Sequence, residues 1–253
     1  MTNDHCRSPQ ARRAELAAAF AELCDLRDSS LDEAGCLDRL VRHSAGLLDV
    51  DGAGVLLADA GGEPTATAGS CETVRLLQLL QVRFRDGPGV ISFRTHVPVH
   101  VADLREVDHW ESFRTTALRA GYLAVHALPL RHHADGLGAL TLFRKRSGAL
   151  SPGDCATGAA LSTVAASLLL DRRELDTART RTTQLQTALD TRIAIEQAKG
   201  VLTERHALTP EAAFELIRAF ARRDRRRIDD VAREVIAHSP AVAALLDPQP
   251  TAR

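Results

Sequence analysis

The sequence lacks the cysteine patterns that are typical of disulfide-stabilised and zinc-stabilised proteins. The 253 residues include five cysteines, at Cys6, Cys24, Cys36, Cys71 and Cys155. They are scattered, odd in number and never in CxxC spacing, which argues against a disulfide framework and a structural zinc site. No apolar run reaches the length of a membrane span, and the N-terminus has no apolar signal segment. We therefore expect a cytoplasmic protein without a membrane partner.

Motifs that carry catalysis are also missing. The sequence contains no nucleophile elbow, P-loop, HExxH or dinucleotide-binding fingerprint. His96 and His100 lie four residues apart with Pro98 between them, so they could share a strand face and bind a metal. Surface histidines in such a position are much more common than metal ligands. We assign no catalytic residue, no metal and no cofactor, and we do not expect an enzyme.

Net charge gives no indication of a partner, because it is only −1 for the whole chain. Basic charge is instead local. Arg218, Arg222, Arg223, Arg225, Arg226 and Arg227 cluster within ten positions, with Asp224 as the acidic residue among them. Such a cluster suits either phosphate contacts or a solvated helix end, where arginine is also favourable. The two readings are about equal on spacing alone.

The stretch from Leu185 to Ile236 predicts three helices. Thr209-Pro210-Glu211 starts the second one, with a hydroxyl N-cap, a proline at the first position and an acidic first turn. Its apolar stripe consists of Ala213, Leu216, Ile217 and Phe220, with Phe214 beside it, and both phenylalanines are predicted to be core. The third helix has the stripe Ile228, Val231, Ala232, Val235 and Ile236.

The first of these helices has two apolar faces. At about 100° per residue, Leu185, Leu189 and Ile193 fall on one side, while Ile195, Ala198 and Leu202 fall roughly opposite. One face can pack on the two following helices, and the other must contact something else, most simply a second chain. A polar strip lies between the faces, formed by Arg192, Glu196, Lys199 and Thr203.

Three blocks of this region resemble the ANTAR domain, a three-helix RNA-binding module of bacterial antitermination regulators. They are 192–202 (RIAIEQAKGVL), 211–218 (EAAFELIR) and 230–232 (DVA), in the family's order and spacing. The chain departs from the family pattern in two places. Thr203 stands where methionine is frequent, and the turn region in which the family often has a polar asparagine reads RRDRRR here (222–227). The resemblance implies an RNA surface made of Arg192, Glu196, Lys199, Gly200, Arg218, Arg222, Arg225 and Arg226. Aromatic residues for base stacking are scarce, so we expect recognition by arginine and hydrogen bonds.

Residues 31–172 predict one α+β domain. Helices are expected at 31–48, 74–84, 90–95 and 110–120, and strands at 54–58, 65–68, 97–101, 124–130 and 137–143. Pro98 favours an edge position for the third strand. The prediction is an antiparallel sheet with helices on one face and at both ends, preceded by a helix from Pro9 to about Arg27.

This pattern resembles a GAF domain. The segment Arg85-Asp86-Gly87-Pro88-Gly89, followed by 98–99 (PV) and 102–104 (ADL), matches GAF domains that are fused to ANTAR domains. Those domains often have cysteine where Gly89 stands, so thiol chemistry at that position is absent here. The resemblance implies a sensor or dimerisation domain whose ligand is unknown.

From Ser151-Pro152 a long helix is expected, because no proline or glycine occurs between Gly158 and Gly200. Leucines recur at heptad spacing, which predicts a short, imperfect coiled coil with the dimer seam Leu161, Leu168, Leu175, Leu185 and Leu189. A single surface helix is the alternative. The predicted organisation is a tail and flanking helix over 1–30, the GAF-like domain over 31–172, the linker helix over 173–190, the all-α ANTAR-like domain over 182–240 and a C-terminal tail over 241–253.

Together these features predict a cytoplasmic homodimeric regulator. Its ANTAR-like domains would bind tandem hairpins in nascent leader RNA and permit transcription to continue, while the GAF-like domain senses a small molecule or holds the dimer. Two alternatives remain. Three short helices with an arginine-rich turn also suit a DNA-binding regulator, and the GAF-like domain could be the centre of a redox or ligand sensor.

Overall fold

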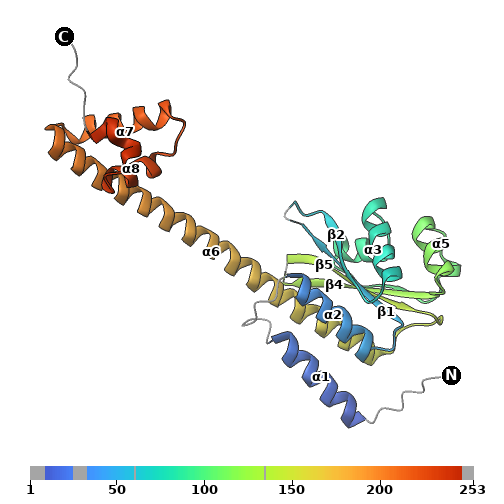
Figure 1. Cartoon of the computed structure of the whole chain (residues 1–253). Coiled ribbons are helices and arrows are strands. Elements are labelled where there is room, and N and C mark those ends of the chain that lie inside the picture. The colour runs from blue at the N-terminus through green and yellow to red at the C-terminus, as the bar shows by residue number, and fades with distance from the viewer. Residues whose placement is uncertain (1–8, 25–32, 60, 134, 247–253) are drawn as a thin grey trace. The chain divides into compact units, whose positions relative to one another are not determined.

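The structure is a computed structural model of the chain, and it describes residues 9–24, 33–59, 61–133 and 135–246 (Figure 1). The chain divides into two compact units, Met1–Glu174 and Leu175–Arg253. One long helix, α6 (Pro152–His206), contributes to both units. Each unit is described separately below.

Unit 1 is built on a five-stranded antiparallel sheet with the order β2-β1-β5-β4-β3. The strands are β1 (Gly52–Ala58), β2 (Pro64–Gly69), β3 (Val99–Val101), β4 (Ala124–His132) and β5 (Asp135–Arg144). The β4–β5 hairpin is confirmed, with strands that run further into the polar turn than the hydrophobic pattern suggested. Strand β3 lies at the edge, and it begins directly after Pro98, which has no N–H to donate to a ladder.

One face of the sheet is covered by α2 (Glu33–Leu47) and the beginning of α6. Leu40 of α2, Leu57 of β1 and Leu161 of α6 are buried in one core cluster. Helix α1 (Pro9–Cys24) packs on α2, where Leu23 is completely buried. The predicted end of this helix near Arg27 lies outside the described residues. Unit 1 therefore includes the flanking helix.

The opposite face is covered by α3 (Glu72–Phe84), α4 (Pro88–Thr95) and α5 (Glu111–Arg119). Figure 1 shows α2 and α6 on one side of the sheet and α3 and α5 on the other. The prediction of helices on one face was therefore wrong. All seven residues of β1 are buried, and the adjacent Leu56 and Leu57 belong to cores on opposite faces. A strand without polar alternation is the mark of a sheet covered on both sides.

Helix α6 starts at the predicted cap. The Ser151 hydroxyl accepts a hydrogen bond from the Asp154 N–H at 3.0 Å and donates one to the Asp154 carboxylate at 2.7 Å. The first of these bonds satisfies a backbone donor that has no partner inside the helix. Residues 174–190 are all exposed.

Helix α6 is, by length and composition, apolar enough to cross a membrane, contrary to the expectation that no run reaches such a length. Leu161, Ala165, Ala166 and Leu169 of this helix are buried in the core of unit 1. Its apolar residues therefore have a packing role inside the domain.

Unit 2 consists of the end of α6, α7 (Pro210–Arg223), α8 (Ile228–Ile236) and a short C-terminal pair, η3 (Pro240–Val242) and α9 (Ala243–Leu246). The predicted N-cap of α7 is confirmed, since the Thr209 hydroxyl accepts from the Ala212 N–H at 3.3 Å. The three predicted helices are present.

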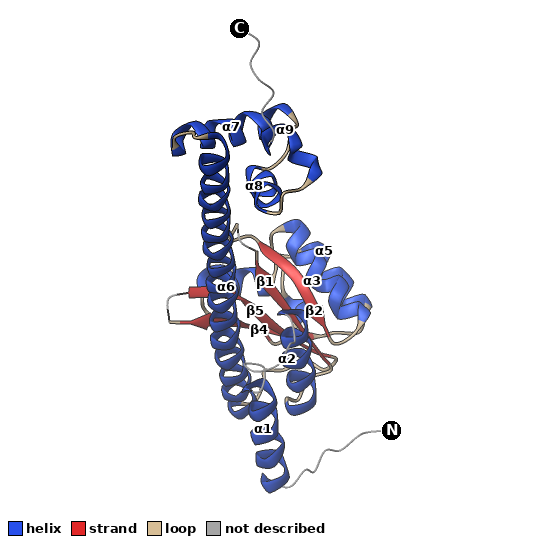
Figure 2. Ribbon diagram, turned by 60° about the vertical axis from the view of Figure 1, so that its left-hand side comes forward, coloured by secondary structure: helices blue, strands red, loops and turns tan. Residues whose placement is uncertain are grey.

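The sequence predicted a simple tail over 241–253, but residues 241–246 are packed on the rest of unit 2. Val242, Leu245 and Leu246 are buried in the core of unit 2, and α9 lies beside α7 (Figure 2). The His206 ring N–H also reaches the Leu245 carbonyl oxygen, with Nε2 and O 2.8 Å apart. This segment is too short for helical periodicity to reveal its burial.

Candidate nucleic-acid interface

Helix α6 has the two faces that its sequence predicts. Ala194, Ala198 and Leu202 are buried in the core of unit 2, and Ile195 packs against it. On the other side, large apolar side chains remain uncovered: Leu185 is 72% exposed, Leu189 52% and Ile193 45%. Large exposed apolar patches are typical of surfaces that bind other molecules.

The polar strip lies along the same stretch of α6. The Lys199 Nζ atom lies 2.9 and 2.8 Å from the two carboxylate oxygens of Glu196, one turn earlier. The Lys199 side chain is only 17% exposed, whereas Glu196 is 58% exposed. The lysine stem therefore lies along the protein surface, and its ammonium group is held in a pair that solvent and other ions can reach. Arg192, further along the strip, is exposed.

Gly200 leaves the helix backbone bare beside Lys199. A Cβ atom built at this position would have no heavy atom of the described residues within 4 Å, so the packing of these residues does not require a glycine here. A glycine inside a helix costs roughly 0.5–1 kcal/mol relative to alanine. The open space would admit the close approach of another molecule to the helix backbone.

The arginine cluster at the end of α7 is largely paired, which the sequence did not indicate. Four of its members form ion pairs: Arg218 with Glu215, Arg223 with Asp224, Arg226 with Glu234 and Arg227 with Asp229. The prediction counted only Asp224, which lies inside the cluster, whereas Glu215 and Asp229 lie just outside it and Glu234 comes from α8. Hydrogen bonds from Arg223 and Arg226 lower the pKa values of Asp224 and Glu234, respectively, so both carboxylates stay ionised at neutral pH.

Arg222 and Arg225 are the two exposed members that form no ion pair with the described residues. Arg222 lies in the last turn of α7, and Arg225 directly follows the C-cap residue Asp224 with a left-handed φ of 52°. Its N–H bonds to the Arg222 carbonyl oxygen, and the Arg226 N–H bonds to that of Ala221, so the turn is closed by backbone hydrogen bonds. Both guanidinium groups are thus available to an anion from solution.

The two phenylalanines of α7 differ. Phe220 is 6% exposed and belongs to the core, with the Arg223 guanidinium 4.7 Å from its ring centre. Phe214 is only partly buried and lies outside the core cluster, and Leu216 is 37% exposed. The prediction that Phe214 is core was wrong, because the buried stripe runs through Ala213, Ile217 and Ala221 instead.

The predicted dimer seam is also divided. Leu161 is completely buried and Leu168 packs against the same core in unit 1, so neither belongs to an exposed seam. The heptad pattern counted them because it cannot distinguish burial inside a domain from burial between chains. Leu175, Leu185 and Leu189 are exposed, at 52%, 72% and 52%.

The interior of unit 1 is polar below α3. Gln78 and Gln81 are completely buried, and the Gln81 amide donates to the Gln78 oxygen at 2.8 Å while the Gly89 N–H donates to the Gln81 oxygen at 2.7 Å. A Cβ atom at Gly54 would lie 2.5 Å from the Gln78 nitrogen, and one at Gly89 would lie 2.8 Å from the Thr141 hydroxyl. These glycines therefore make room for the glutamines, whose side chains fill this space.

The histidines do not form the pair considered from the sequence. His100 contacts His126 of the neighbouring strand, with their Nδ1 atoms 3.2 Å apart, and not His96. Burial, together with the nearby His100 and Arg144, lowers the pKa of His126 to about 4. Among the described residues, no group of three or more possible ligands comes together to hold a metal ion.

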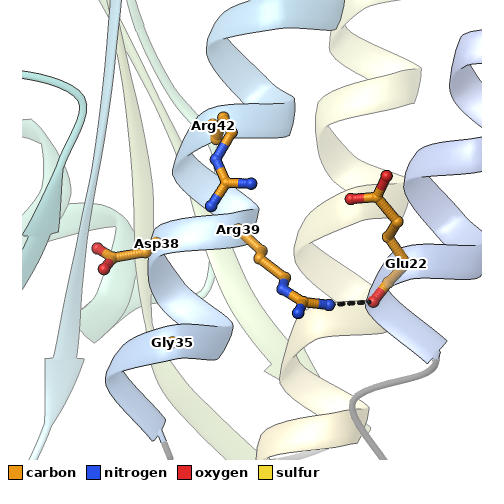
Figure 3. Close-up of a pocket in the computed structure, with 5 residues that line it drawn as sticks. All are labelled: Glu22, Gly35, Asp38, Arg39 and Arg42. Carbon is orange, nitrogen blue, oxygen red and sulfur yellow. Dashed lines mark hydrogen bonds between the residues drawn. The ribbon is translucent and has the colours of Figure 1, made fainter. Parts of the chain in front are cut away.

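A depression of about 450 Å³ lies between α1 and α2 (Figure 3). Its lining carries equal numbers of acidic and basic side chains, and Arg39 donates to the Glu22 carbonyl oxygen at 3.2 Å. The lining residues are Glu22, Gly35, Asp38, Arg39 and Arg42. This balance of charge indicates no particular class of ligand.

Comparison with known families assigns both units. Residues 30–169 match the family model of the GAF domain, and residues 183–236 match that of the ANTAR domain. No curated protein matches the chain.

Solved structures agree with the fold of unit 1. The GAF domain of a phosphoenolpyruvate-protein phosphotransferase from Coxiella burnetii has 15% sequence identity and a TM-score of 0.51, over 65% of this chain and 98% of that one. Free methionine-R-sulfoxide reductase from Neisseria meningitidis, in complex with its substrate, has 12% identity and a TM-score of 0.51, over 69% and 98%. At these identities the likeness shows the fold alone. The two family models together show that the chain belongs to the family of regulators in which a GAF domain is followed by an ANTAR domain.

Proposed function

We propose that this chain is a cytoplasmic transcription antitermination regulator. In this proposal its ANTAR domains bind hairpins in nascent leader RNA as a dimer, and its GAF domain senses a ligand or holds the dimer. The observation that carries the proposal is the combination, on an ANTAR domain, of a bare helix backbone with two arginines that form no ion pair with the described residues. These are Arg222 and Arg225 at the end of α7 and just after it, and Gly200 beside Lys199 on α6.

These groups suit RNA chemically. Unpaired guanidinium groups supply phosphate contacts, whose contribution weakens with salt because bound counterions are released. Sequence-specific RNA recognition uses loop bases that are turned outward and read by hydrogen bonds and by stacking on flat side chains. Arg192 and the partly exposed Phe214 add such surfaces, whereas the buried Phe220 does not.

Dimerisation is supported by the middle of α6. Residues 174–190 are exposed and contain five threonines, which are weak helix formers. The hydroxyls of Thr182 and Thr187 bond to carbonyl oxygens four residues earlier, a contact that slightly destabilises a helix. An isolated solvated helix of this length is marginal in water. A second copy packed on Leu185 and Leu189 would stabilise it.

The test is a salt titration of the full-length protein with a two-hairpin leader RNA and with a DNA duplex of the same length. Tighter RNA binding that is lost when the loops are scrambled supports the proposal. The double variant Arg222→Ala/Arg225→Ala should lower the slope of log K against log salt by about 1.4–1.8, the value for two phosphate contacts. The matched control is Arg131→Ala, an exposed arginine of unit 1, which should leave the slope unchanged.

DNA binding is the second candidate. Only residues 207–209 separate α6 from α7, and residues 224–227 separate α7 from α8. Connections of three or four residues are typical of helix-turn-helix motifs. Equal or tighter binding to the DNA duplex in the same titration would replace the RNA proposal with this one.

A further inference from the structure

Helix α3 of unit 1 carries an apolar stripe on the side that points away from the sheet. Leu76 is 47% exposed and Leu79 is 50% exposed. The stripe continues to Glu72 in the first turn of the helix and to Arg83 in the last turn, and both are exposed. At about 100° per residue, these four positions fall within roughly 60° of one another around the helix axis, whereas the completely buried Val74 points the other way. We call these four residues the α3 stripe.

The spacing of the α3 stripe is the same in both chain directions. Its members are separated by four, three and four residues, which is the a/d spacing of a coiled-coil seam. When two such stripes lie antiparallel, Leu76 of each copy meets Leu79 of the other, and Glu72 of each copy meets Arg83 of the other. A parallel arrangement would instead set Glu72 against Glu72 and Arg83 against Arg83, which like-charge repulsion disfavours. Charge therefore selects the antiparallel arrangement.

We propose that the α3 stripe is a docking surface for a second copy of this chain, in an antiparallel helix pair with two-fold symmetry. The contact consists of two leucine layers between two ion pairs of Glu72 with Arg83. An interface about a two-fold axis has to be complementary to itself, and the α3 stripe meets this condition. The charge that each end of the stripe needs is carried by its other end, which identifies a second copy as the occupant.

The charges on α3 are compatible with this pairing. Arg75 donates from one guanidinium nitrogen to both carboxylate oxygens of Glu72, at 2.8 and 2.6 Å. This hydrogen bond lowers the pKa of Glu72, so the carboxylate stays ionised at neutral pH. A carboxylate has about four lone-pair sites and can accept a second guanidinium group. Arg83 forms no ion pair with the described residues, and Phe84, 55% exposed, adds apolar surface beside it.

This surface is separate from the exposed leucines of α6. Helix α3 lies on one face of the sheet, and α2 and the beginning of α6 cover the other (Figure 1). The α3 stripe spans roughly 16 Å at 1.5 Å per residue, which is too short to bury the roughly 1,200–2,000 Å² of a stable complex. We therefore expect a weak association that depends on protein concentration. Where α6 already joins two chains, the α3 contact joins such dimers to one another, which goes beyond the proposed function and does not rest on it.

The test is a pair of charge reversals in the full-length chain, made singly and together. Glu72→Arg leaves a cation at both ends of the stripe and Arg83→Glu a carboxylate at both ends, so each variant repels itself in the antiparallel pair. Sedimentation velocity over a concentration series should show the α3 association weakened about tenfold in each, because two exposed ion pairs become two repulsions. The double variant Glu72→Arg/Arg83→Glu restores opposite charges and should associate within about twofold of the wild-type chain. Its recovery also shows that neither substitution disrupts the fold.

Matched controls lie on the neighbouring helix α5. Glu111→Arg and Arg119→Glu reverse exposed charges in its first and last turns, so they share any effect of the helix dipole. Their association should stay within about twofold of the wild-type value. Pairing through α6 is a separate step that none of these substitutions alters, so its failure is distinguishable from failure of the α3 contact. A wild-type chain without a concentration-dependent step, single variants that associate like the wild type, or a double variant as weak as the single ones would each overturn the proposal.

Discussion

Replacing Gly200 by alanine should raise stability and lower RNA affinity at the same time. Gly200 lies inside α6, and a Cβ atom there would meet nothing within 4 Å. Alanine therefore fits without strain and restricts the unfolded chain. The free energy of unfolding should increase by roughly 0.5–1 kcal/mol, the usual difference between glycine and alanine inside a helix.

The effect on binding has the opposite sign because the added methyl group occupies the open space. If the RNA backbone approaches α6 at this point, the methyl group separates the two surfaces and Lys199 loses its contact distance. An affinity loss of about tenfold corresponds to 1.4 kcal/mol of lost contact. Most mutations that weaken binding through misfolding lower stability as well, so opposite signs identify a direct contact.

Two measurements on the full-length protein decide the matter: urea unfolding followed by circular dichroism, and RNA titration at fixed salt. Gly46→Ala is the control, since Gly46 is a helical glycine of unit 1 whose Cβ position is also open. This variant should keep its RNA affinity. Unchanged affinity of Gly200→Ala would refute the contact, and a loss of stability would refute the reading of the space as open.

Three further predictions follow from burial. Phe220→Ala should cost about 3–5 kcal/mol of unfolding free energy as a core truncation, and Phe214→Ala about 1 kcal/mol or less, in parallel urea melts; equal costs would contradict the packing. Leu189→Asp should convert a dimer to monomers in sedimentation, whereas an unchanged dimer would move the interface elsewhere. Because the pKa of His126 is lowered to about 4 from about 6.5 in the unfolded chain, the unfolded state binds the proton first as pH falls. The free energy of unfolding should be constant above about pH 6.5 and decrease by up to about 3 kcal/mol toward pH 4. His126→Gln should remove this decrease, and a variant with the same pH profile as the wild-type chain would contradict the prediction.

The ANTAR domain was predictable from the sequence because its helices are marked locally. The Thr209 hydroxyl caps α7 and Pro210 starts it, and the apolar period of α8 specifies which of its faces is buried. The two faces of α6 followed from the same arithmetic, and the burial of Ala198 and the exposure of Leu185 confirm it.

The GAF domain was predictable in its elements but not in its layers. Leu56 and Leu57 are both buried, and only the packed sheet shows that each faces a different layer of helices. A run of apolar residues cannot reveal what covers each side.

Only the tertiary structure decides which side chains from different segments pair or pack together. The sequence placed six arginines together, but the packing of α8 on α7 brings Glu234 to Arg226, and Asp229 pairs with Arg227 two residues earlier. Arg222 and Arg225 form no ion pair with the described residues. Leu161 and Leu189 stand in the same heptad series, yet one is completely buried inside unit 1 and the other is exposed. Periodicity along one helix fixes the direction of a side chain, whereas the identity of its neighbour depends on segments far apart in the chain.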